Sequence, residues 1–456
     1  MKERQAFTEG KILPSLIFFA LPVLLALFLQ TMYGAVDLLI VGQFGGELSD
    51  VYVSAVSTGS QVMQTVTLMI TALSTGLTVF VGMKIGAGKQ TEAGKIIGTG
   101  IWLFGLIALV VTGTMVFAAP QLARIMQAPE AASSQTVSYI RICSSGAVFI
   151  VAYNLMGSIF RGIGDSKIPL VTVAIACVLN IAGDLLLVAG FHMGGSGAAI
   201  ATVFAQAVSV LLTLPVIRRR KLPFIFSLRD VQPKGFYIKM ILKLGMPIAL
   251  QDLLVSISFL IIMAIVNQLG LTPSAGVGVA DKLCGFLMLV PSAYMQSMSA
   301  FVAQNIGADK PERAKRALLY GILSSLVVSS IMAWMSFFHG ELLAGLFARK
   351  TDVILAAADY LRAYAVDCLL TSFLFCFVGY FNGCGCTAFV MVQGIVGAFG
   401  VRVPVSWLMS RQVEVSLFRV GLATPASTLV QIIFCFGYFG FTLHRQKRRP
   451  QKNGFD

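Results

Sequence analysis

Charged residues are scarce in this chain of 456 residues, where Asp, Glu, Lys and Arg together make up only 12%. Apolar residues make up 57%, and the mean hydropathy is +0.84. Soluble domains carry about twice this share of charge. The composition therefore excludes a soluble globular protein and indicates a chain that lies largely within a membrane.

Residues that usually carry enzyme chemistry are also few or badly spaced. The three histidines, His192, His339 and His444, lie too far apart for an H-E-x-x-H zinc motif. The eight cysteines have no metal or redox spacing, since the closest pair, Cys384 and Cys386, reads C-x-C, and most are expected to be packing residues. No G-x-x-x-x-G-K-[ST] motif occurs, which excludes a phosphate-binding loop of that kind. We expect no cofactor, and any transport must draw on an ion gradient.

Long polar gaps are missing as well, because apolar segments of about 20 residues recur along the whole chain, each long enough to cross a bilayer. Their unbroken runs favour helices over the alternating strands of a barrel. The N-terminal stretch lacks the features of a secretory signal, so the first helix is expected to remain as a span. The twelve predicted spans cover residues 14–41, 52–82, 96–119, 136–160, 168–190, 196–217, 244–269, 275–304, 317–338, 356–382, 386–409 and 417–443.

The net charge of +14 follows the predicted topology. Most Lys and Arg residues fall on one face if the N-terminus is cytoplasmic, which predicts that both termini are inside the cell. The other face keeps chiefly Arg124, Arg349, Lys350 and Arg411. Two basic clusters sit where anionic lipid headgroups lie, so we expect phospholipid contact and no nucleic-acid binding. The clusters are Arg218, Arg219, Arg220 and Lys221, and Arg445, Lys447, Arg448 and Arg449.

An internal repeat divides the chain in two. Residues 81–95 (VGMKIGAGKQTEAGK) align with residues 302–316 (VAQNIGADKPERAKR) at an offset of 221, and F-R-G-I-G at 160–164 aligns with F-N-G-C-G at 381–385. At an offset of 225, Pro22 falls on Pro247 and Gln43 on Gln268. Each copy holds six helices, an even number, so both copies have the same orientation in the membrane.

The repeat predicts an all-α membrane protein whose two six-helix lobes are related by a pseudo-twofold axis along the membrane normal. We expect an N-terminal lobe over residues 1–217, a cytoplasmic linker over 218–243, a C-terminal lobe over 244–443 and a basic tail over 444–456. Rocking of such lobes around a central cavity would give alternating access.

Comparing the two copies singles out four polar residues. Acidic residues inside spans are costly and are functional candidates by default. Asp37 lies in the first span and Asp184 in the fifth, with Asn180 one helical turn before Asp184. The corresponding residues in the second copy are apolar: Ile262 for Asp37, Val401 for Asn180, Val405 for Asp184 and Ala423 for Thr202. Packing common to both copies would require polar groups in both, so the set predicts a site in the N-terminal lobe alone.

Two carboxyls, an amide carbonyl and a hydroxyl are oxygen ligands of the kind that hard cations prefer. The set Asp37, Asn180, Asp184 and Thr202 could hold Na⁺, or a proton that neutralises one carboxyl and changes how the Pro22-containing first helix packs. The structural alternatives are a hydrogen bond from Tyr33 to Asp37, and interhelical hydrogen bonding by Asp184 and Asn180.

Further residues are candidates for supporting substrate binding or coupling. Tyr33, Gln30 and Pro22 share the first span with Asp37. Asp252 and Asp367, in the seventh and tenth spans, could contact a cationic substrate or a second ion, although Asp367 could also sit at the outer boundary, where a carboxyl is less costly.

Four motifs carry a resemblance to a known family. They are Y-G-A-V-D at 33–37 followed by V-G at 41–42, F-R-G-I-G-D-S-K-I-P at 160–169, L-N-I-A-G-D at 179–184 and G-G-S-G-A-A-I-A-T at 194–202. The chain resembles the multidrug and toxic compound extrusion (MATE) family over nearly its whole length, and its DinF-like branch in particular. In that branch the residues matching Asp37, Asn180, Asp184 and Thr202 form the cation site. The resemblance implies efflux of drugs and other organic cations, driven by H⁺ or Na⁺.

Three other classes of membrane protein share part of this sequence pattern. A lipid-precursor or polysaccharide flippase would share the fold but line its cavity with basic residues, which are few here. An intramembrane aspartyl protease would use the G-x-G-D pattern at 162–165, but Asp165 lies in a predicted cytoplasmic turn. A major-facilitator transporter would carry a D-R-x-G-R-R type loop, which is missing. We therefore predict a monomeric, multi-pass antiporter of the plasma membrane and no enzyme.

Overall fold

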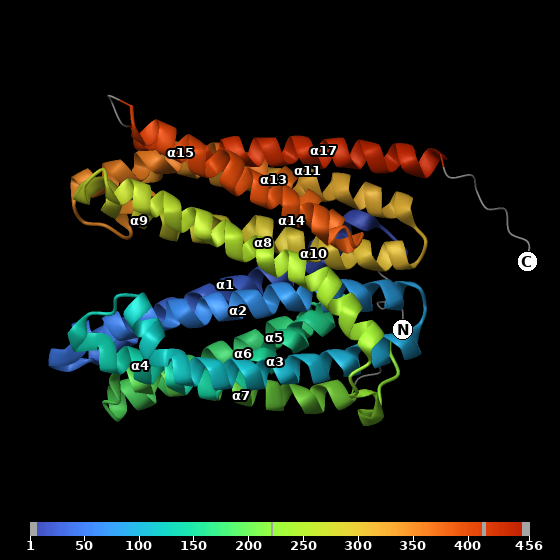
Figure 1. Cartoon of the computed structure of the whole chain (residues 1–456), viewed down its shortest axis with the longest axis horizontal. Coiled ribbons are helices and arrows are strands. Elements are labelled where there is room, and N and C mark those ends of the chain that lie inside the picture. The colour runs from blue at the N-terminus through green and yellow to red at the C-terminus, as the bar shows by residue number, and fades with distance from the viewer. Residues whose placement is uncertain (1–6, 220–221, 413–415, 449–456) are drawn as a thin grey trace, which may run out of the picture. The chain divides into compact units, whose positions relative to one another are not determined.

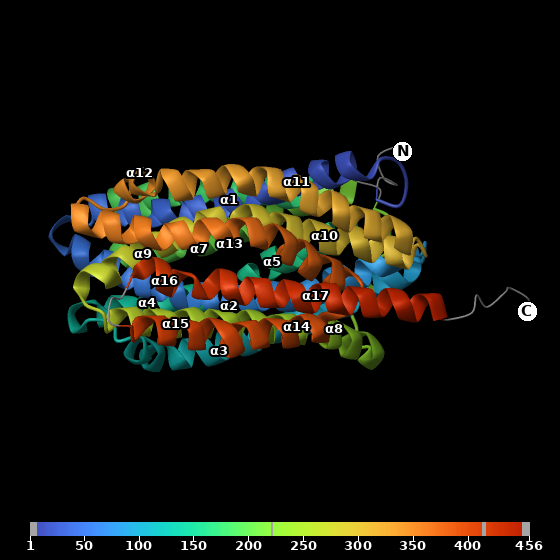
Figure 2. The same cartoon turned by 90° about the horizontal axis from the view of Figure 1, so that it is seen from above.

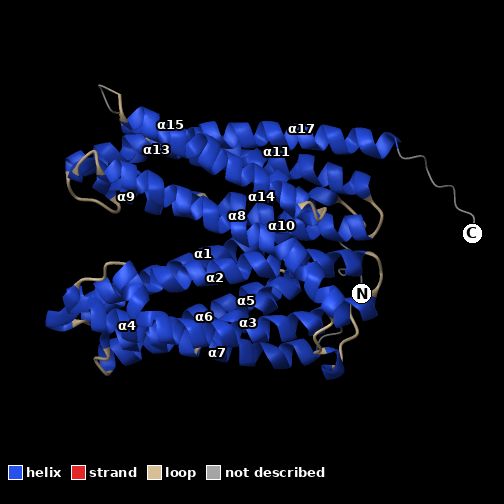
Figure 3. Ribbon diagram, in the orientation of Figure 1, coloured by secondary structure: helices blue, strands red, loops and turns tan. Residues whose placement is uncertain are grey.

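The computed structural model describes residues 7–219, 222–412 and 416–448. Over these ranges the chain forms helices joined by loops, with no strand (Figure 3). The side chains of Arg218 and of residues 445–448 lie outside the described set, as do Arg220, Lys221 and Arg449, so most of both predicted lipid-binding clusters falls there.

Twelve membrane-crossing elements follow the apolar runs of the sequence. Eleven described helices are long and apolar enough to span a bilayer, and the bent pair α4 and α5, with an angle of 55° between them, makes a twelfth. The first half contains α1 (Ile12–Phe44), η1 (Gly46–Leu48), α2 (Ser49–Gly86), α3 (Gln90–Ile125), α4 (Glu130–Ser145), α5 (Ala147–Gly162), α6 (Lys167–Asp184), η2 (Leu185–Gly190), α7 (Gly194–Arg219) and η3 (Leu228–Asp230).

The second half repeats this order with more breaks. It contains α8 (Gly235–Asn267), α9 (Leu271–Leu287), α10 (Leu289–Gly307), α11 (Pro311–Phe338), α12 (Gly340–Gly345), α13 (Thr351–Gly383), α14 (Thr387–Ile395), η4 (Val396–Arg402), α15 (Val403–Ser410), α16 (Leu417–Gly421) and α17 (Ala423–Arg448). Each predicted span overlaps one of these helices or helix pairs. Helix α8 begins at Gly235, so the end of the segment predicted as a linker is helical.

The chain forms two compact units. Unit 1 comprises Met1–Leu253, Gln296–Ala317 and Gly379–Ala388. Within it α6 packs along α7, α2 along α4 and α5, and α1 along α6 (Figures 1 and 2). Its main apolar core includes Leu77, Phe104 and Ile241, which are fully buried. Unit 1 therefore contains all the helices of the first half, together with short parts of helices from the second.

Unit 2 comprises Leu254–Met295, Leu318–Val378 and Phe389–Asp456. Its apolar core joins Ile262, Leu361 and Val420, and α17 packs along η4. In both units large apolar side chains also lie on the outside, such as Phe18, Phe117 and Leu260. Helices with an apolar exterior satisfy their own backbone hydrogen bonds, which is what a lipid environment requires.

The internal repeat is visible as repeated glycine contacts inside unit 1. A Cβ on Gly162 would lie 2.8 Å from the Thr78 carbonyl oxygen, and a Cβ on Gly383 would lie 2.7 Å from the Ser299 carbonyl oxygen. The repeat offset of 221 relates Gly162 to Gly383 and Thr78 to Ser299, so the two contacts are equivalent. Both copies therefore use glycine at the end of F-x-G to bring two helices together.

A second glycine pair joins one copy to the other. A Cβ on Gly86 in α2 would lie 1.9 Å from the Gln304 carbonyl oxygen, and a Cβ on Gly307 in α10 would lie 2.0 Å from the Met83 carbonyl oxygen. The offset of 221 relates Gly86 to Gly307 and Met83 to Gln304, so the two contacts are equivalent by the pseudo-twofold symmetry. At this point only glycine allows the two backbones to approach.

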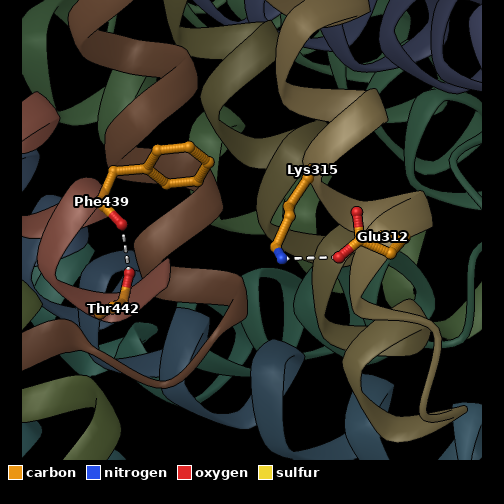
Figure 4. Close-up of polar contacts among 4 residues, drawn as sticks. All are labelled: Glu312, Lys315, Phe439 and Thr442. Carbon is orange, nitrogen blue, oxygen red and sulfur yellow. Dashed lines mark hydrogen bonds and ion pairs between the residues drawn. The ribbon is translucent and has the colours of Figure 1, made fainter. Parts of the chain in front are cut away.

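The beginning of the described chain is fastened to the first turn of α11. Arg313 donates hydrogen bonds to the carbonyl oxygens of Phe7, Glu9 and Gly10 at 2.7–2.8 Å. In the same turn Lys315 Nζ lies 2.7 Å from Glu312 Oε1 (Figure 4). Near the other end of the described chain, in α17, the Thr442 hydroxyl donates to the Phe439 carbonyl oxygen at 2.8 Å (Figure 4).

Replacing Gly86 with leucine tests the contact between α2 and α10. Because the added Cβ would overlap the Gln304 carbonyl oxygen, we expect Gly86→Leu to destabilise the fold by about 1–3 kcal/mol, the usual cost of overpacking. The measurement is the thermal unfolding midpoint of the detergent-purified protein.

The matched control is Gly105→Leu in α3, where a Cβ would meet nothing within 4 Å. It should unfold at or slightly above the wild-type temperature, since leucine is a better helix former than glycine. Equal unfolding temperatures for the two variants would contradict the close contact.

Candidate functional site

The predicted polar set comes together where α1, α6 and α7 meet in unit 1. Helices α6 and α7 approach closely at Gly183, which has no side chain. A Cβ added to Gly183 would lie only 2.9 Å from the Ala201 Cβ. Ala198 and Ala199, also on α7, are fully buried. The small residues of the motifs at 179–184 and 194–202 thus allow the close helix packing on which the site depends.

Thr202 links the three helices. Its hydroxyl donates to Asp37 Oδ2 at 3.4 Å and to the Ala198 carbonyl oxygen at 3.0 Å. Asn180 Nδ2 donates to Thr202 Oγ1 at 3.3 Å. The carboxyl groups of Asp37 and Asp184 also interact with each other. The structure therefore places all four predicted residues in one cluster.

The cluster is buried, and several of its oxygens lack a hydrogen-bond donor. Asp37 is 5% exposed, Asn180 2% and Asp184 0%, whereas Thr202 is half-buried. Asp37 Oδ1, Asn180 Oδ1 and both Asp184 carboxyl oxygens accept no hydrogen bond from the described residues. Buried polar atoms normally have a partner. Four buried oxygens without donors, on residues of one cluster, fit a cation or a proton.

The ionisable side chains of the cluster are both acidic. Among the described residues, no Lys, Arg or His interacts with Asp37 or Asp184. Two neighbouring carboxylates in a buried site repel each other, and burial penalises each charge. The pair is therefore compatible with burial only when a proton or a cation offsets at least one charge.

Asp184 also marks a change in the backbone. It is the last residue of α6, and the chain continues as the π-helix η2. Single π-helical turns often occur at functional sites, because they shift the register of side chains on either side. The corresponding helix of the second copy also contains a π-helix, η4, but at a different register.

The supporting residues on α1 have other partners. Tyr33 lies in hydrogen-bonding range of Gln206 on α7. A hydroxyl does bond Asp37, as one structural alternative expected, but among the described residues this hydroxyl belongs to Thr202 and not to Tyr33. Gln30 Nε2 donates to the Tyr153 hydroxyl at 3.3 Å. Pro22 lies within α1, four turns before Asp37.

The remaining two acids lie in different units. Asp252 is a half-buried residue of α8 in unit 1, and it has at least one interaction partner. Asp367 belongs to α13 in unit 2, is 2% exposed, and accepts a hydrogen bond from the Thr428 hydroxyl at 2.6 Å. Asp367 is thus buried against protein and already has a partner.

Two residues near the sites were not predicted. Gln206 follows Thr202 by one helical turn on α7, and this i, i+4 spacing of polar residues was a usable signal. Arg402 interacts electrostatically with Asp367 across unit 2.

Comparison with known proteins identifies the family and the fold of this chain. The MatE family model matches residues 22–186 and 247–408, one segment in each copy of the repeat. The "Probable multidrug resistance protein YoeA" of Bacillus subtilis is 24% identical, covering 95% of this chain and 94% of the relative. An "FAD transporter" of Shewanella oneidensis is 26% identical over 78% of each chain.

A solved structure shares the fold. It is described as an outward-facing conformation of a multidrug resistance MATE family transporter, and it is 21% identical with a TM-score of 0.90 over 98% of this chain and 99% of that one. The relatives are named as transporters and not as enzymes. With its repeated six-helix unit and a family match over most of both copies, the chain belongs to the MatE family of multidrug and toxic compound extrusion transporters.

Proposed function

We propose that this transporter is a secondary active antiporter, which exports small organic cations and other xenobiotics in exchange for H⁺ or Na⁺. The observation that carries the proposal is the buried pair Asp37 and Asp184, which has no basic partner among the described residues. A site that needs a positive charge, in a protein that moves solutes, supports coupling to a mobile cation.

Each residue of the cluster would have a separate role in binding the cation. Asp37 and Asp184 provide the negative charge, and Asn180 Oδ1 and the Thr202 hydroxyl complete an oxygen-lined site for Na⁺. A proton would instead be shared between the two carboxyls. In either case the arriving ion removes the repulsion between α1 and α6, and its departure restores it. Two packings of α1 that differ in this way are the kind of two-state element that alternating access requires.

The substrate class rests on the named relatives. YoeA and the solved transporter are described as multidrug resistance proteins, which supports a xenobiotic substrate. The Shewanella relative is named as an FAD transporter, and because FAD is an anion this name does not support a cationic substrate. The few basic residues inside the spans favour cationic over anionic substrates. We further propose that the chain acts as a monomer in the plasma membrane, with both termini in the cytoplasm and phospholipid headgroups along its basic face.

Transport in proteoliposomes tests the coupling. With a Na⁺ gradient or a pH gradient imposed separately, we expect at least one gradient to drive uptake of a fluorescent organic cation. Asp37→Asn should reduce gradient-driven uptake by about tenfold or more, since about 1.4 kcal/mol of lost ion affinity corresponds to a factor of ten.

The matched control is Asp50→Asn, which removes an exposed carboxyl from α2 and should transport like wild type. Wild-type protein that takes up the dye equally with and without either gradient would overturn ion coupling. Gradient-driven movement of FAD or a lipid-linked precursor, with no movement of the dye, would overturn the substrate class.

Thr202→Val tests whether the hydroxyl belongs to the ion site. The variant keeps the shape of the side chain but removes one ligand and one hydrogen bond, worth about 1 kcal/mol. We expect the ion concentration for half-maximal transport to rise about fivefold, with little change in maximal rate.

Thr114→Val on α3 is the control, because its exposed hydroxyl bonds only to the carbonyl oxygens of Val110 and Val111 in its own helix. An unchanged ion dependence in Thr202→Val, in a protein that folds normally, would remove Thr202 from the site.

A further inference from the structure

Residues 7–10, which precede α1 and are called the N-terminal strap below, are held by side chains of the second copy of the repeat. Each of their four backbone carbonyl oxygens accepts a hydrogen bond. The donors are Arg313, Asn305 and Lys310, at distances of 2.7–2.9 Å. Arg313 alone supplies three of the five hydrogen bonds. The strap is therefore bound along its backbone, and all of these residues belong to unit 1.

The two ends of the strap have different roles. Phe7 is 6% exposed, and its ring packs against Phe19 on α1 and Phe301 on α10, with centroid distances of 4.9 and 5.0 Å. Gly10 has a backbone φ of +72°, which favours glycine, and it leads into the start of α1. The aromatic ring thus anchors the strap, while Gly10 lets the chain turn into the first helix.

The strap binds next to the closest approach of the two copies. Asn305 falls between Gln304 and Gly307 of α10, and both of these residues take part in the glycine contacts with α2. Helix α11, which carries Arg313, continues beyond Ala317 into unit 2. The strap therefore ties the start of α1, the helix of the cation cluster, to two helices of the other copy.

The first copy of the repeat lacks this set of donors. At the offset of 221, an acid, Glu92, stands where the second copy has Arg313. Lys84 and Lys89 stand at the positions of the other two donors, and Glu92 pairs with them at 2.6 and 3.4 Å. In the first copy these side chains therefore satisfy one another. Packing common to both copies does not need the donors, so they serve the strap in particular.

The segment that precedes the first helix of the second copy is held differently. It comprises residues 225–230 and packs on the start of α3. A Cβ on Gly94 would overlap the Ile225 carbonyl oxygen, and a Cβ on Gly98 would overlap the Asp230 carbonyl oxygen. That segment is fixed by contact between backbones. The strap is instead held by side-chain hydrogen bonds, which can be exchanged for hydrogen bonds to water.

We propose that the N-terminal strap closes the proposed cytoplasmic side of the transporter and is released from Arg313 in each transport cycle. The proposal rests on the alternating access of the proposed function and adds a moving segment to it. Because the strap joins α1 to α10 and α11, these helices can move apart at this end only if the strap leaves one of them. Glu9 and Gly10 are exposed, so water can replace Arg313 at their carbonyl oxygens.

Thiol labelling tests the release in full-length protein reconstituted into proteoliposomes. The reporter is Thr8→Cys, because Thr8 is half-buried and contributes its backbone carbonyl to the contact. Labelling by a water-soluble maleimide is measured at position 8 by mass spectrometry of the N-terminal peptide, which separates it from the native cysteines. We expect the labelling rate to rise about fivefold when an ion gradient and the fluorescent cation are supplied together, since local opening exposes the thiol.

Arg313→Ala in the reporter background removes three of the five hydrogen bonds and should speed labelling at position 8 even without a gradient. The matched control is Lys315→Ala, which removes a positive charge from the same turn of α11, where Lys315 pairs with Glu312 (Figure 4). The control should label like the reporter alone. If Arg313→Ala fails to fold, Arg313→Lys decides. It should label at an intermediate rate, because an ammonium lacks the fork of donors that binds several carbonyls.

A reversible cross-link tests whether transport needs the release. Thr8→Cys/Lys310→Cys places two thiols at neighbouring positions, because the Lys310 ammonium reaches the Thr8 carbonyl oxygen. A short bis-methanethiosulfonate reagent should stop gradient-driven uptake of the fluorescent cation, and dithiothreitol should restore it. Thr8→Cys alone, treated in the same way, is the control and should keep its uptake.

Three results would overturn the proposal. They are a labelling rate at position 8 that is the same with and without transport, equal labelling of folded Arg313→Ala and Lys315→Ala, and full uptake by the cross-linked protein. Failure of the proposed ion coupling looks different. Uptake by the wild type would then not depend on a gradient, while labelling at position 8 would still respond to Arg313→Ala.

Discussion

The cost of burying charge is the constraint on which the functional part of this structure depends. Asp37 and Asp184 are packed among α1, α6 and α7 with no basic side chain beside them in the described chain. Such a pair tolerates burial only with a proton or a cation present. The close packing of Gly183 against Ala201 contributes to this situation, because it places α6 and α7 near enough for Asn180 to reach Thr202.

Gene duplication explains both what the two halves share and how they differ. The shared part is the helix framework, which reuses glycine at Gly162 and Gly383 for equivalent backbone contacts. The differing part is charge, since the first half buries Asp37 and Asp184 where the second has Ile262 and Val405. A framework fixed by backbone contacts leaves the polar residues free to diverge between the two copies.

The proposed mechanism follows from this difference. Where a counter-charge is covalently part of the chain, the charge balance cannot change during transport. Where it is a mobile ion, arrival and departure alter the repulsion between helices α1 and α6, and so can bias two packings of those helices.

The sequence by itself determined the twelve spans, the duplication and the residues Asp37, Asn180, Asp184 and Thr202, because apolar run length and a comparison of two copies are properties of linear order. Only the tertiary structure decided the 55° bend between α4 and α5, since hydropathy carries no direction. Likewise it decided that Thr202 is the donor to Asp37, and that Thr428 is the donor to Asp367. These partners lie on separate helices, and their meeting depends on how the helices pack in three dimensions.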